Sequence, residues 1–324
     1  MTLPAISFVT VNFNSGAKAC ALIDSIRRYA VNAEIVVVDN ASSDNSRELL
    51  DSVAGPDLHC IYNDRNLGYG KANNIGVAAA RAPVVVLVNP DAVFSAGIEL
   101  DSYFCGQLAD STVGAVAPRI LYPDGSLQPN FANRYNSIRT FIAQLFSLGK
   151  LYRLIKSRGW GAKLAEKAGT VLFGAAGREY ANRFDAVSAS DACAWVSGAC
   201  IGMRKTTFDA VGGFDDTFFL YSEDEDLCRR IRALGLKICY APTLTLVHEV
   251  GGTDAVKRSV GQLGWGEFHR IQSGLMYLKK YNVGNWISLK MAYTAAVLLR
   301  LIGGLYIMFS PLRSARLILS LVKI

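Results

Sequence analysis

Four consecutive acidic residues, Glu223–Asp226, lie where the sequence predicts that a loop becomes a helix. Apolar residues recur at helical spacing from Leu227 onward, and Gly235 stands where the helix is expected to end. Ser222 and Glu225 have the S-x-x-E spacing of a capping box, and acids favour a helix N-terminus. Four adjacent carboxylates repel one another, so we expect at least one to have a raised pKa or a cationic partner. A carboxylate with a raised pKa is suited to act as a general base.

Polar residues also follow the predicted buried strands. Ala5–Val11, Glu34–Val38 and Pro83–Val88 are short apolar runs rich in β-branched residues, which predicts strands of a parallel sheet. Ligands bind beyond the carboxyl ends of such strands. Each polar residue at these ends could form a turn by itself, but several at one edge favour a ligand site. The residues concerned are Asn12, Asn14, Asp39, Asn40, Asn89 and Asp91.

The stretch Asn66–Gly76 (NLGYGKANNIG) is rich in glycine and opens another predicted helix. Its spacing fits neither the dinucleotide-binding motif G-x-G-x-x-G nor the P-loop motif. Backbone amides at the start of this helix, together with Lys71, could still approach a phosphate group.

The second half of the chain contains two further groups of candidate residues. A core-like stretch includes Asp191 and Trp195–Gly198, whose tryptophan is either a core residue or a stacking platform for a sugar. His248 stands near the end of the predicted strand Thr243–Glu249, where an isolated histidine is usually structural. A glycine pair follows it closely, which favours a mobile loop over a site.

The remaining pattern predicts an α/β fold in which strands and helices alternate. Further elements are expected as strands at Cys60–Tyr62, Gly114–Leu121 and Lys237–Tyr240, helices to about Tyr29 and Val53, and a turn at Tyr122–Ser126. The 324 residues, 51% of them hydrophobic, can form one large domain with additions or two smaller ones. The seven cysteines include no C-x-x-C pair, so we expect reduced core thiols in a cytosolic protein, without disulfides or zinc. The first residues lack the basic region and cleavage site of a signal peptide.

The net charge of +7 is unevenly distributed along the chain. Residues 1–118 and 184–256 each carry a net −5, whereas residues 119–183 carry +8 and residues 257–324 carry +9. The first basic block interleaves basic and apolar residues at helical spacing, which is typical either of a helix packed on the core or of a helix at an anionic membrane surface. Neither block resembles a nucleic-acid-binding module, so nucleic acid is not an expected partner.

The segment Met291–Phe309 contains 19 residues, of which only Arg300 is charged. This length could span a bilayer, but a central arginine would cost about 2.5–3.5 kcal/mol on insertion. Gly303 and Gly304 also weaken a single straight helix. We therefore favour a helix that lies in the membrane plane or forms a dimer over one that spans the membrane.

Seven short motifs follow one another along the chain: TVNFNSG, VVVDNASSDNS, NLGYGKANNIG, LVNPDA, WVSGAC, GGFDDTFFLYSEDEDLCRRIRALG and HEVGGT. From about Ile6 to Thr253, this order resembles the inverting family 2 glycosyltransferases and, among them, bacterial rhamnosyltransferases most. The resemblance implies a GT-A fold, which is Rossmann-like with a mostly parallel central sheet flanked by helices. The expected domains are a nucleotide-sugar-binding half (1–118), a basic amphipathic insertion (119–185), an acceptor and catalytic half (186–256) and C-terminal helices that bind membrane or dimerise (257–324).

The resemblance also implies roles for individual residues. Asp224 would be the catalytic base with Glu223 beside it, and a divalent metal, Mg²⁺ or Mn²⁺, would bind Asp91 and His248. The nucleotide would contact Thr10, Asn12, Asp39, Asn40, Gly68, Gly70, Lys71, Asn73 and Asn89. The sugar and the acceptor would lie against Asp191, Trp195, Ser197 and Gly198.

One position departs from the family pattern, because many relatives carry D-x-D where this chain has Asn89-Pro90-Asp91. A neutral amide is a weaker ligand than a carboxylate, so we expect weaker metal affinity. The expected reaction moves L-rhamnose from dTDP-rhamnose to a polyprenyl-diphosphate-linked or growing cell-surface glycan. It would take place at the cytoplasmic face of the inner (plasma) membrane, with the protein bound peripherally. The alternatives are a UDP-sugar donor, a non-catalytic sugar-nucleotide-binding scaffold and a nucleotidyltransferase.

Overall fold

The computed structural model describes residues 3–95, 97–133, 135–138, 141, 193–249, 265–285, 287–291 and 294. The chain divides into two compact units. The first comprises Met1–Tyr135 with Arg183–Thr253, and the second comprises Asn136–Asn182 with Asp254–Ile324. Asp191 and most of the predicted basic insertion lie outside the described residues.

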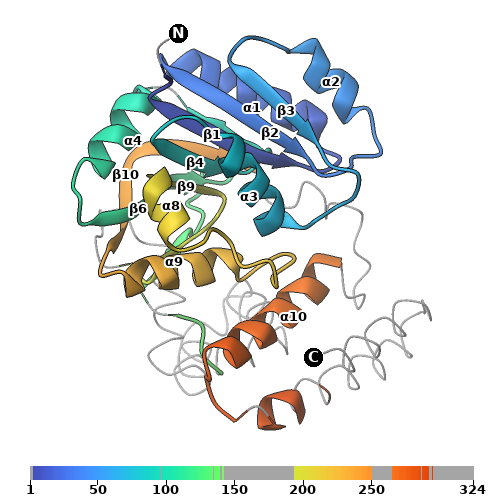
Figure 1. The fold of residues 1–324 in the computed structure, drawn as a ribbon, viewed down its shortest axis with the longest axis vertical. Coiled ribbons are helices and arrows are strands. Elements are labelled where there is room, and N and C mark those ends of the chain that lie inside the picture. Colours follow the sequence, from blue (N-terminus) through green and yellow to red (C-terminus); the bar gives the residue numbers. More distant parts are fainter. Residues whose placement is uncertain are drawn as a thin grey trace, which may run out of the picture. The chain divides into compact units, whose positions relative to one another are not determined.

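An eight-stranded sheet forms the centre of the first unit (Figure 1). Its strands are β1 (Ile6–Asn12), β2 (Ala33–Asp39), β3 (Leu58–Tyr62), β4 (Val84–Val88), β5 (Ala92–Phe94), β6 (Val113–Leu121), β9 (Cys200–Arg204) and β10 (Lys237–His248). They are arranged in the order β3-β2-β1-β4-β9-β6-β10-β5. Two short strands, β7 (Phe131–Ala132) and β8 (Trp195–Val196), pair with each other in a second sheet.

The central sheet is mixed, so the prediction of a mostly parallel sheet is confirmed only in part. β3, β2, β1 and β4 are parallel neighbours, as their apolar runs predicted. β9 is antiparallel to both β4 and β6, and β5 is antiparallel to β10, whereas β10 is parallel to β6. The reversal arises because the chain enters β9 at the end of β4, with Cys200 opposite Val88, and must run back along that strand.

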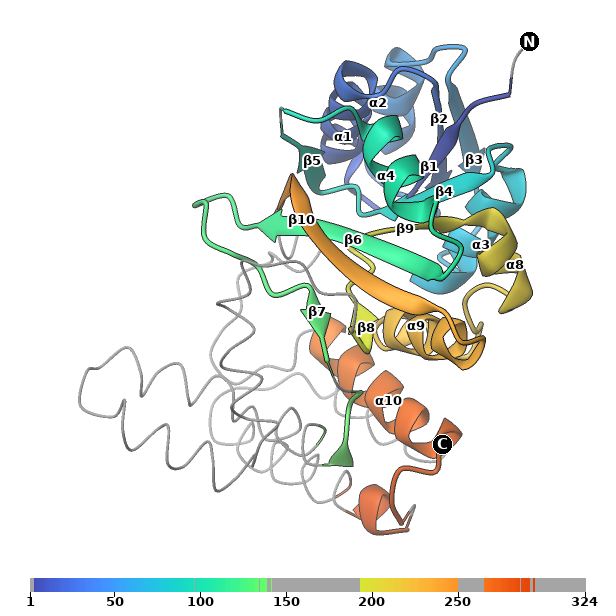
Figure 2. The same cartoon turned by 90° about the vertical axis from the view of Figure 1, so that its left-hand side faces the viewer.

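Helices cover both faces of the sheet. One face carries α1 (Gly16–Tyr29), α2 (Ser46–Ser52) and α4 (Leu100–Leu108), and the other carries α3 (Tyr69–Ala79), α8 (Lys205–Ala210) and α9 (Glu223–Ala233) (Figure 2). Alternate side chains of each strand therefore enter different cores. In β1, Phe8 packs into the core under α1 and α4, and Val9 packs into the core under α3 and α9. Because apolar side chains cover both faces of the sheet, the polar residues lie at the ends of the strands.

The sequence predicted the turn after β6 correctly, but it predicted the neighbouring strand β10 as two separate strands. The turn at Tyr122–Ser126 is confirmed, since the Tyr122 N–H donates to the Ser126 carbonyl at 2.8 Å. The two predicted strands Lys237–Tyr240 and Thr243–Glu249 form the single strand β10. A shift in its register against β6, between Tyr240 and Thr245, marks the place where the sequence indicated a break.

The capping box predicted at Ser222 is wrong, although α9 begins at the next residue. Ser222 has a left-handed φ of 68°, and its side chain makes no capping hydrogen bond. The Glu225 N–H donates instead to Oδ1 of Asp224 at 2.8 Å. The helix ends where the sequence predicted, because Gly235 adopts a φ of 80° two residues after Ala233.

The described part of the second unit is mainly α10 (Trp265–Lys280), which buries Leu275 and Leu278 and carries two lysines in its last turn. Within the residues that the structure describes, no helix is both long enough and apolar enough to cross a membrane. The apolar segment Met291–Phe309 lies almost wholly outside those residues, so its predicted behaviour stays a prediction.

Candidate active site

The carboxyl ends of six strands lie at one edge of the sheet. β1, β2, β3 and β4 are parallel, and β6 and β10 share their direction because β9 is antiparallel to both β4 and β6. Asn12 ends β1, Asp39 ends β2, Asn89 follows β4 and His248 ends β10. The predicted convergence of polar residues on one edge is confirmed, and it includes the histidine.

Side chains at the ends of β1 and β2 form one hydrogen-bonded group. Asn12 Nδ2 donates to Asp39 Oδ2 at 2.7 Å and to Ser42 Oγ at 3.1 Å. Asp39 Oδ1 accepts the Ser42 N–H at 2.9 Å. Asn14 joins the same loop, since its N–H donates to Ser42 Oγ and its Oδ1 accepts the Ser43 N–H, both at 2.8 Å. The Asp39 carboxylate is thereby fixed at the sheet edge.

Asn40 uses its whole amide group to shape the loop before α3. Its Oδ1 accepts the Leu67 N–H at 3.0 Å and Nδ2 of Asn63 at 3.1 Å. Its Nδ2 donates to Asn66 Oδ1 at 2.8 Å and to the Gly68 carbonyl at 3.2 Å. An amide has two donors and two acceptor sites, so all four are in use. Asn40 therefore builds the predicted nucleotide loop, and a direct contact with a nucleotide stays a prediction.

The glycine stretch that opens α3 packs against the loop before α9. Gly68 has a φ of 87°, and a Cβ added there would overlap the Phe219 carbonyl oxygen. The same carbonyl accepts the Tyr69 N–H at 2.9 Å. Lys71 pairs with Asp216 at 3.1 Å, with both side chains about half exposed. The predicted role of Lys71 at a phosphate stays a prediction.

Several predicted site residues bury an oxygen atom that has no hydrogen-bond partner among the described residues. The atoms are Oγ1 of Thr10, Oδ1 of Asn12, Oδ1 of Asn73 and Oε2 of Glu223. Buried polar atoms without a partner are rare in proteins, and a ligand or a bound water commonly satisfies them. Gly70, on the same helix as Asn73, lies close to the Phe214 side chain. A Cβ added at Gly70 would come within 2.9 Å of Phe214 Cβ.

His248 lies between the loop after β4 and the turn after β6. Its Nε2 is 3.1 Å from Oδ1 of Asp91 and 3.2 Å from Nδ2 of Asn89. Its Nδ1 is 3.1 Å from both Oε1 and Nε2 of Gln128, so this side chain can accept from or donate to the ring. The Glu249 N–H donates to the Asp91 carbonyl at 3.0 Å, which fixes the end of β10 beside the loop that carries Asp91.

The Asp91–His248 pair fits a divalent cation. When Nδ1 donates its proton to Oε1 of Gln128, the Nε2 lone pair lies 3.1 Å from a carboxylate oxygen, and the two atoms can then bind one cation together. Adjacent ligands of an octahedral Mg²⁺ or Mn²⁺ are about 3 Å apart, given bonds of about 2.1 Å. Within the described part of the chain, no cluster of three or more His, Cys, Asp or Glu residues could hold a metal. The ion would therefore need further ligands from water or a diphosphate.

The Glu223–Asp224 pair at the start of α9 has perturbed ionisation. Burial raises the pKa of Asp224, although hydrogen bonds from the Gly198 N–H at 3.1 Å and the Glu225 N–H at 2.8 Å oppose this rise. Burial, and then the charge of Asp224, raise the pKa of Glu223 well above its usual value. The predicted consequence of four adjacent acids, a raised pKa, is confirmed.

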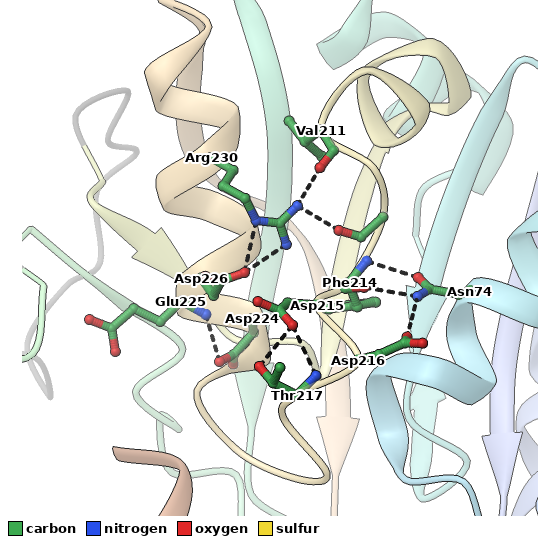
Figure 3. A network of polar contacts seen from close by, with 11 residues as sticks. Asn74, Val211, Phe214, Asp215, Asp216, Thr217, Asp224, Glu225, Asp226 and Arg230 are labelled. Carbon is green, nitrogen blue, oxygen red and sulfur yellow. Dashed lines mark hydrogen bonds and ion pairs between the residues drawn. The ribbon is translucent and has the colours of Figure 1, made fainter. Parts of the chain in front are cut away.

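A cationic partner is present as well, at the fourth acid. Asp226 is fully buried, and its Oδ2 lies 2.8 Å from Nε and 2.7 Å from Nη2 of Arg230, one helical turn later (Figure 3). Nη1 of Arg230 donates to the carbonyls of Val211 and Gly213 at 2.5 and 2.6 Å. Arg230 therefore connects α9 to the loop that precedes it.

The turn after β8 brings the predicted acceptor residues to Asp224. The Ser197 N–H donates to the Asn130 carbonyl at 2.7 Å, and the Gly198 N–H reaches Asp224. Trp195 is partly buried and packs against the core beneath α3 and α9, which supports its structural interpretation. A contact between Trp195 and a sugar stays a prediction.

A family profile described as "Glycosyl transferase family 2" matches residues 7–163. The chain belongs to glycosyltransferase family 2. It is 26% identical over 225 residues to an N-acetylglucosaminyl-diphospho-decaprenol L-rhamnosyltransferase of Mycobacterium tuberculosis, and the match covers 66% of each chain. It is 37% identical over 54 residues to the rhamnosyltransferase WbbL of Escherichia coli, a match to 17% of this chain and 20% of that relative.

Solved structures of other transferases share the fold of this family 2 chain. The mannosyltransferase PcManGT from Pyrobaculum calidifontis, in complex with GDP-Man and Mn²⁺, superposes with a TM-score of 0.55 at 16% identity, covering 99% of this chain and 80% of its own. GalNAc-T7 with UDP, GalNAc and Mn²⁺ gives 0.56 at 13% identity, covering 86% and 48%. These similarities support the GT-A-like α/β fold with a mixed central sheet.

The sequence predicted no role for three residues of the candidate site: Ser42, Tyr69 and Gln128. Ser42 lies inside a quoted polar motif, and Tyr69 lies inside the glycine stretch, so their motifs were found but not their roles. Gln128 orients His248 from a position 120 residues away, beyond any motif quoted, and no local signal marks it.

Proposed function

We propose that this family 2 chain transfers a sugar from a nucleotide donor with inversion of configuration, and that Asp224 is its general base. The observation that carries the proposal is the environment of Asp224 at the start of α9. Burial raises the pKa of its carboxyl group, while two backbone N–H groups stabilise the charged form. A raised pKa makes the carboxylate a stronger base, and the two N–H groups hold it in the ionised form that accepts a proton.

Within the Glu223–Asp224 pair, we expect a proton to bind Glu223 in preference to Asp224. Asp224 accepts two backbone hydrogen bonds, which favour its ionised form. Glu223 is buried, and its Oε2 has no hydrogen-bond partner among the described residues, so its charged form is disfavoured. A neutral Glu223 leaves the negative charge of the pair on the residue that faces the Gly198 turn.

In the proposed reaction, Asp224 removes the proton of the acceptor hydroxyl while the hydroxyl oxygen bonds to the anomeric carbon. The bond from that carbon to the nucleotide diphosphate breaks on the opposite face, and the nucleoside diphosphate leaves with the bonding electrons. A divalent cation held by Asp91 and His248 would neutralise the charge of this leaving group. Asp39, fixed by Asn12 and Ser42, would hold the nucleotide base.

We further propose dTDP-rhamnose as the donor and a polyprenyl-diphosphate-linked glycan as the acceptor, within polysaccharide or cell-wall biosynthesis. Support comes from the name of the Mycobacterium tuberculosis relative and from the match to WbbL. The basic blocks 119–183 and 257–324 would bind anionic lipid at the cytoplasmic face of the membrane and attract the acceptor diphosphate. A UDP-sugar donor is the alternative within the same reaction class.

A thermal-shift screen tests the donor. The purified chain is heated with dTDP, UDP or GDP, each with and without Mn²⁺, since a ligand that binds only the folded state raises the melting temperature. We expect the largest rise with dTDP and a further rise with Mn²⁺. A rise in melting temperature with UDP alone would indicate a UDP-sugar as the donor, and the proposed sugar transfer would remain.

Turnover of Asp224→Asn tests the base. The variant is expected to bind dTDP as the unaltered chain does and to lose roughly 100-fold or more in sugar transfer, which is the range for removing a general base. Near-normal turnover by the folded variant would exclude Asp224 as the general base. Absence of turnover by the unaltered chain with both dTDP- and UDP-sugars would favour the non-catalytic scaffold.

A further inference from the structure

Tyr69, the first residue of α3, lies between the proposed nucleotide loop and the acid pair of α9. Its N–H donates to the Phe219 carbonyl at 2.9 Å, and its hydroxyl donates to the Gly198 carbonyl at 2.7 Å. We propose that Tyr69 is a positioning residue that holds the Asp224 carboxylate in place through the turn at Gly198. The inference rests on the proposed role of Asp224 and adds a residue to which no role has been assigned.

The two peptide groups that flank the Gly198 Cα are each held by one of these side chains. The N–H on one side donates to Asp224 Oδ2 at 3.1 Å, and the carbonyl on the other side accepts the Tyr69 hydroxyl. The Ala199 N–H, which belongs to the same peptide group as that carbonyl, donates to Ser197 Oγ at 3.2 Å. A rotation of the turn that withdrew the N–H from Asp224 would therefore also break the bond from Tyr69.

Packing leaves this turn little freedom of its own. A Cβ added at Gly198 would lie 3.3 Å from the Tyr69 hydroxyl oxygen and 3.5 Å from Cβ of Asp224, so the bare backbone fills the space between the two side chains. The Tyr69 ring packs edge-to-face against Phe214, with ring centroids 6.0 Å apart. The hydroxyl of Tyr69 is thus presented to Gly198 by a ring that is itself held.

The charges around Asp224 explain why a backbone hydrogen bond matters there. Among the residues that the structure describes, Glu223 and Cys228 on α9 and Tyr69 on α3 interact electrostatically with Asp224, and each of the three can only add negative charge. Burial and the two carboxylates keep the pKa of Tyr69 well above its usual value, so it remains a donor. Weakening the Gly198 bond removes one of the bonds that favour ionised Asp224 and raises its pKa further.

The position of α3 does not depend on the Tyr69 hydroxyl. Asn74 Nδ2 donates to the Phe214 carbonyl at 2.9 Å, and Asn74 Oδ1 accepts the Phe214 N–H at 2.8 Å (Figure 3). Lys71 and Asp216 add an ion pair across the same boundary. The substitution Tyr69→Phe should therefore leave α3 in place and remove only the bond to Gly198.

The experiment compares Tyr69→Phe with the matched control Tyr103→Phe. Tyr103 also donates a buried hydroxyl hydrogen bond to a backbone carbonyl, that of Ala241 at 2.6 Å, in the middle of β10 and away from Asp224. Release of dTDP from dTDP-rhamnose is followed from pH 5 to 9 with N-acetylglucosaminyl-diphospho-decaprenol in detergent. For Tyr69→Phe we expect kcat to fall roughly 10-fold, as small misplacements of a catalytic group do. The donor KM should change little, and the acid limb of the profile should move to higher pH.

A second readout does not require turnover. The side-chain carboxyl carbons of aspartate are labelled with ¹³C, the Asp224 resonance is identified by its loss in Asp224→Asn, and its titration is recorded. We expect a higher apparent pKa in Tyr69→Phe than in the unaltered chain, and no change in Tyr103→Phe. Identical titrations in all three proteins would overturn the role of Tyr69. Retained turnover in Asp224→Asn would instead overturn the base, while the titration would still decide whether Tyr69 controls this carboxylate.

Discussion

Loss of the Arg230 side chain should destabilise the first unit strongly. Its guanidinium group lies 2.7 and 2.8 Å from the fully buried Asp226 carboxylate and also donates to the carbonyls of Val211 and Gly213. The substitution Arg230→Met keeps an unbranched apolar stem and removes all of these contacts. The buried Asp226 would then lie in the core without the Arg230 charge.

The magnitude follows from the burial of the partners. Removing one member of a buried ion pair costs about 3–5 kcal/mol, because the other charge has lost its compensation. Each carbonyl that loses a hydrogen bond adds about 1 kcal/mol, less where water can replace the donor. The Arg230 side chain is 22% exposed, so water can reach part of the vacated space. We expect a total loss of about 4 kcal/mol, which lowers the melting temperature by roughly 10 °C in a unit of this size.

Urea unfolding of matched variants checks this expectation. Arg27 makes a similar two-point contact with Asp57, at 2.8 and 2.9 Å, but both side chains are about one-third exposed. Arg27→Met should therefore cost less than about 1 kcal/mol. The double variant Asp226→Leu with Arg230→Met should recover part of the loss, because it removes the buried charge. If Arg230→Met and Arg27→Met cost the same free energy, burial does not determine the strength of the pair and the reasoning is wrong.

Two further predictions concern ionisation and metal binding. Folded Glu223 has a raised pKa, so its contribution to stability is full below the ordinary carboxyl pKa, falls as pH rises above it, and is lost as pH rises through the raised value. Glu223→Gln should therefore unfold at higher urea than the unaltered chain at pH 8, with a smaller difference at pH 4, and should keep turnover; a variant no more stable at pH 8 would contradict the raised pKa. His248→Ala and Asp91→Ala should each lose the additional thermal shift that Mn²⁺ gives with dTDP and keep the shift given by dTDP alone, and an unchanged Mn²⁺ increment would exclude both residues as ligands.

Residues that act locally could be predicted from the sequence, and the acid cluster shows how far this extends. Repulsion among four adjacent carboxylates predicts a raised pKa or a cationic partner, and both occur, at Glu223 and at Asp226. The i,i+4 spacing of Asp226 and Arg230 lies within one helix turn, so helix geometry alone places the partner. The capping box failed because Ser222 adopts a left-handed φ that the spacing of residues does not reveal.

Contacts between distant segments could not be predicted in this way. The Tyr69 hydroxyl and the Gly198 carbonyl are 129 residues apart, and Gln128 and His248 are 120 residues apart. The contact between Tyr69 and Gly198 depends on the antiparallel direction of β9. An apolar run of residues does not indicate in which direction its strand runs. Apolar runs predict that a strand is buried, whereas the direction of a strand depends on which edge of the sheet the chain enters from.

The antiparallel course of β9 is what brings residues from both halves of the sheet together at one edge. Because β9 starts where β4 ends, the turn before it meets the loop after β4, and the Asn89 N–H donates to the Ala199 carbonyl at 3.0 Å. The same turn carries Gly198, which reaches Asp224 on α9 and Tyr69 on α3. Gly202 allows α4 to pack closely on β9, since an added Cβ there would overlap the Phe104 ring. The register of β9, with Cys200 opposite Val88 at the end of β4, places Gly198 just beyond that end, where it can reach both α3 and α9.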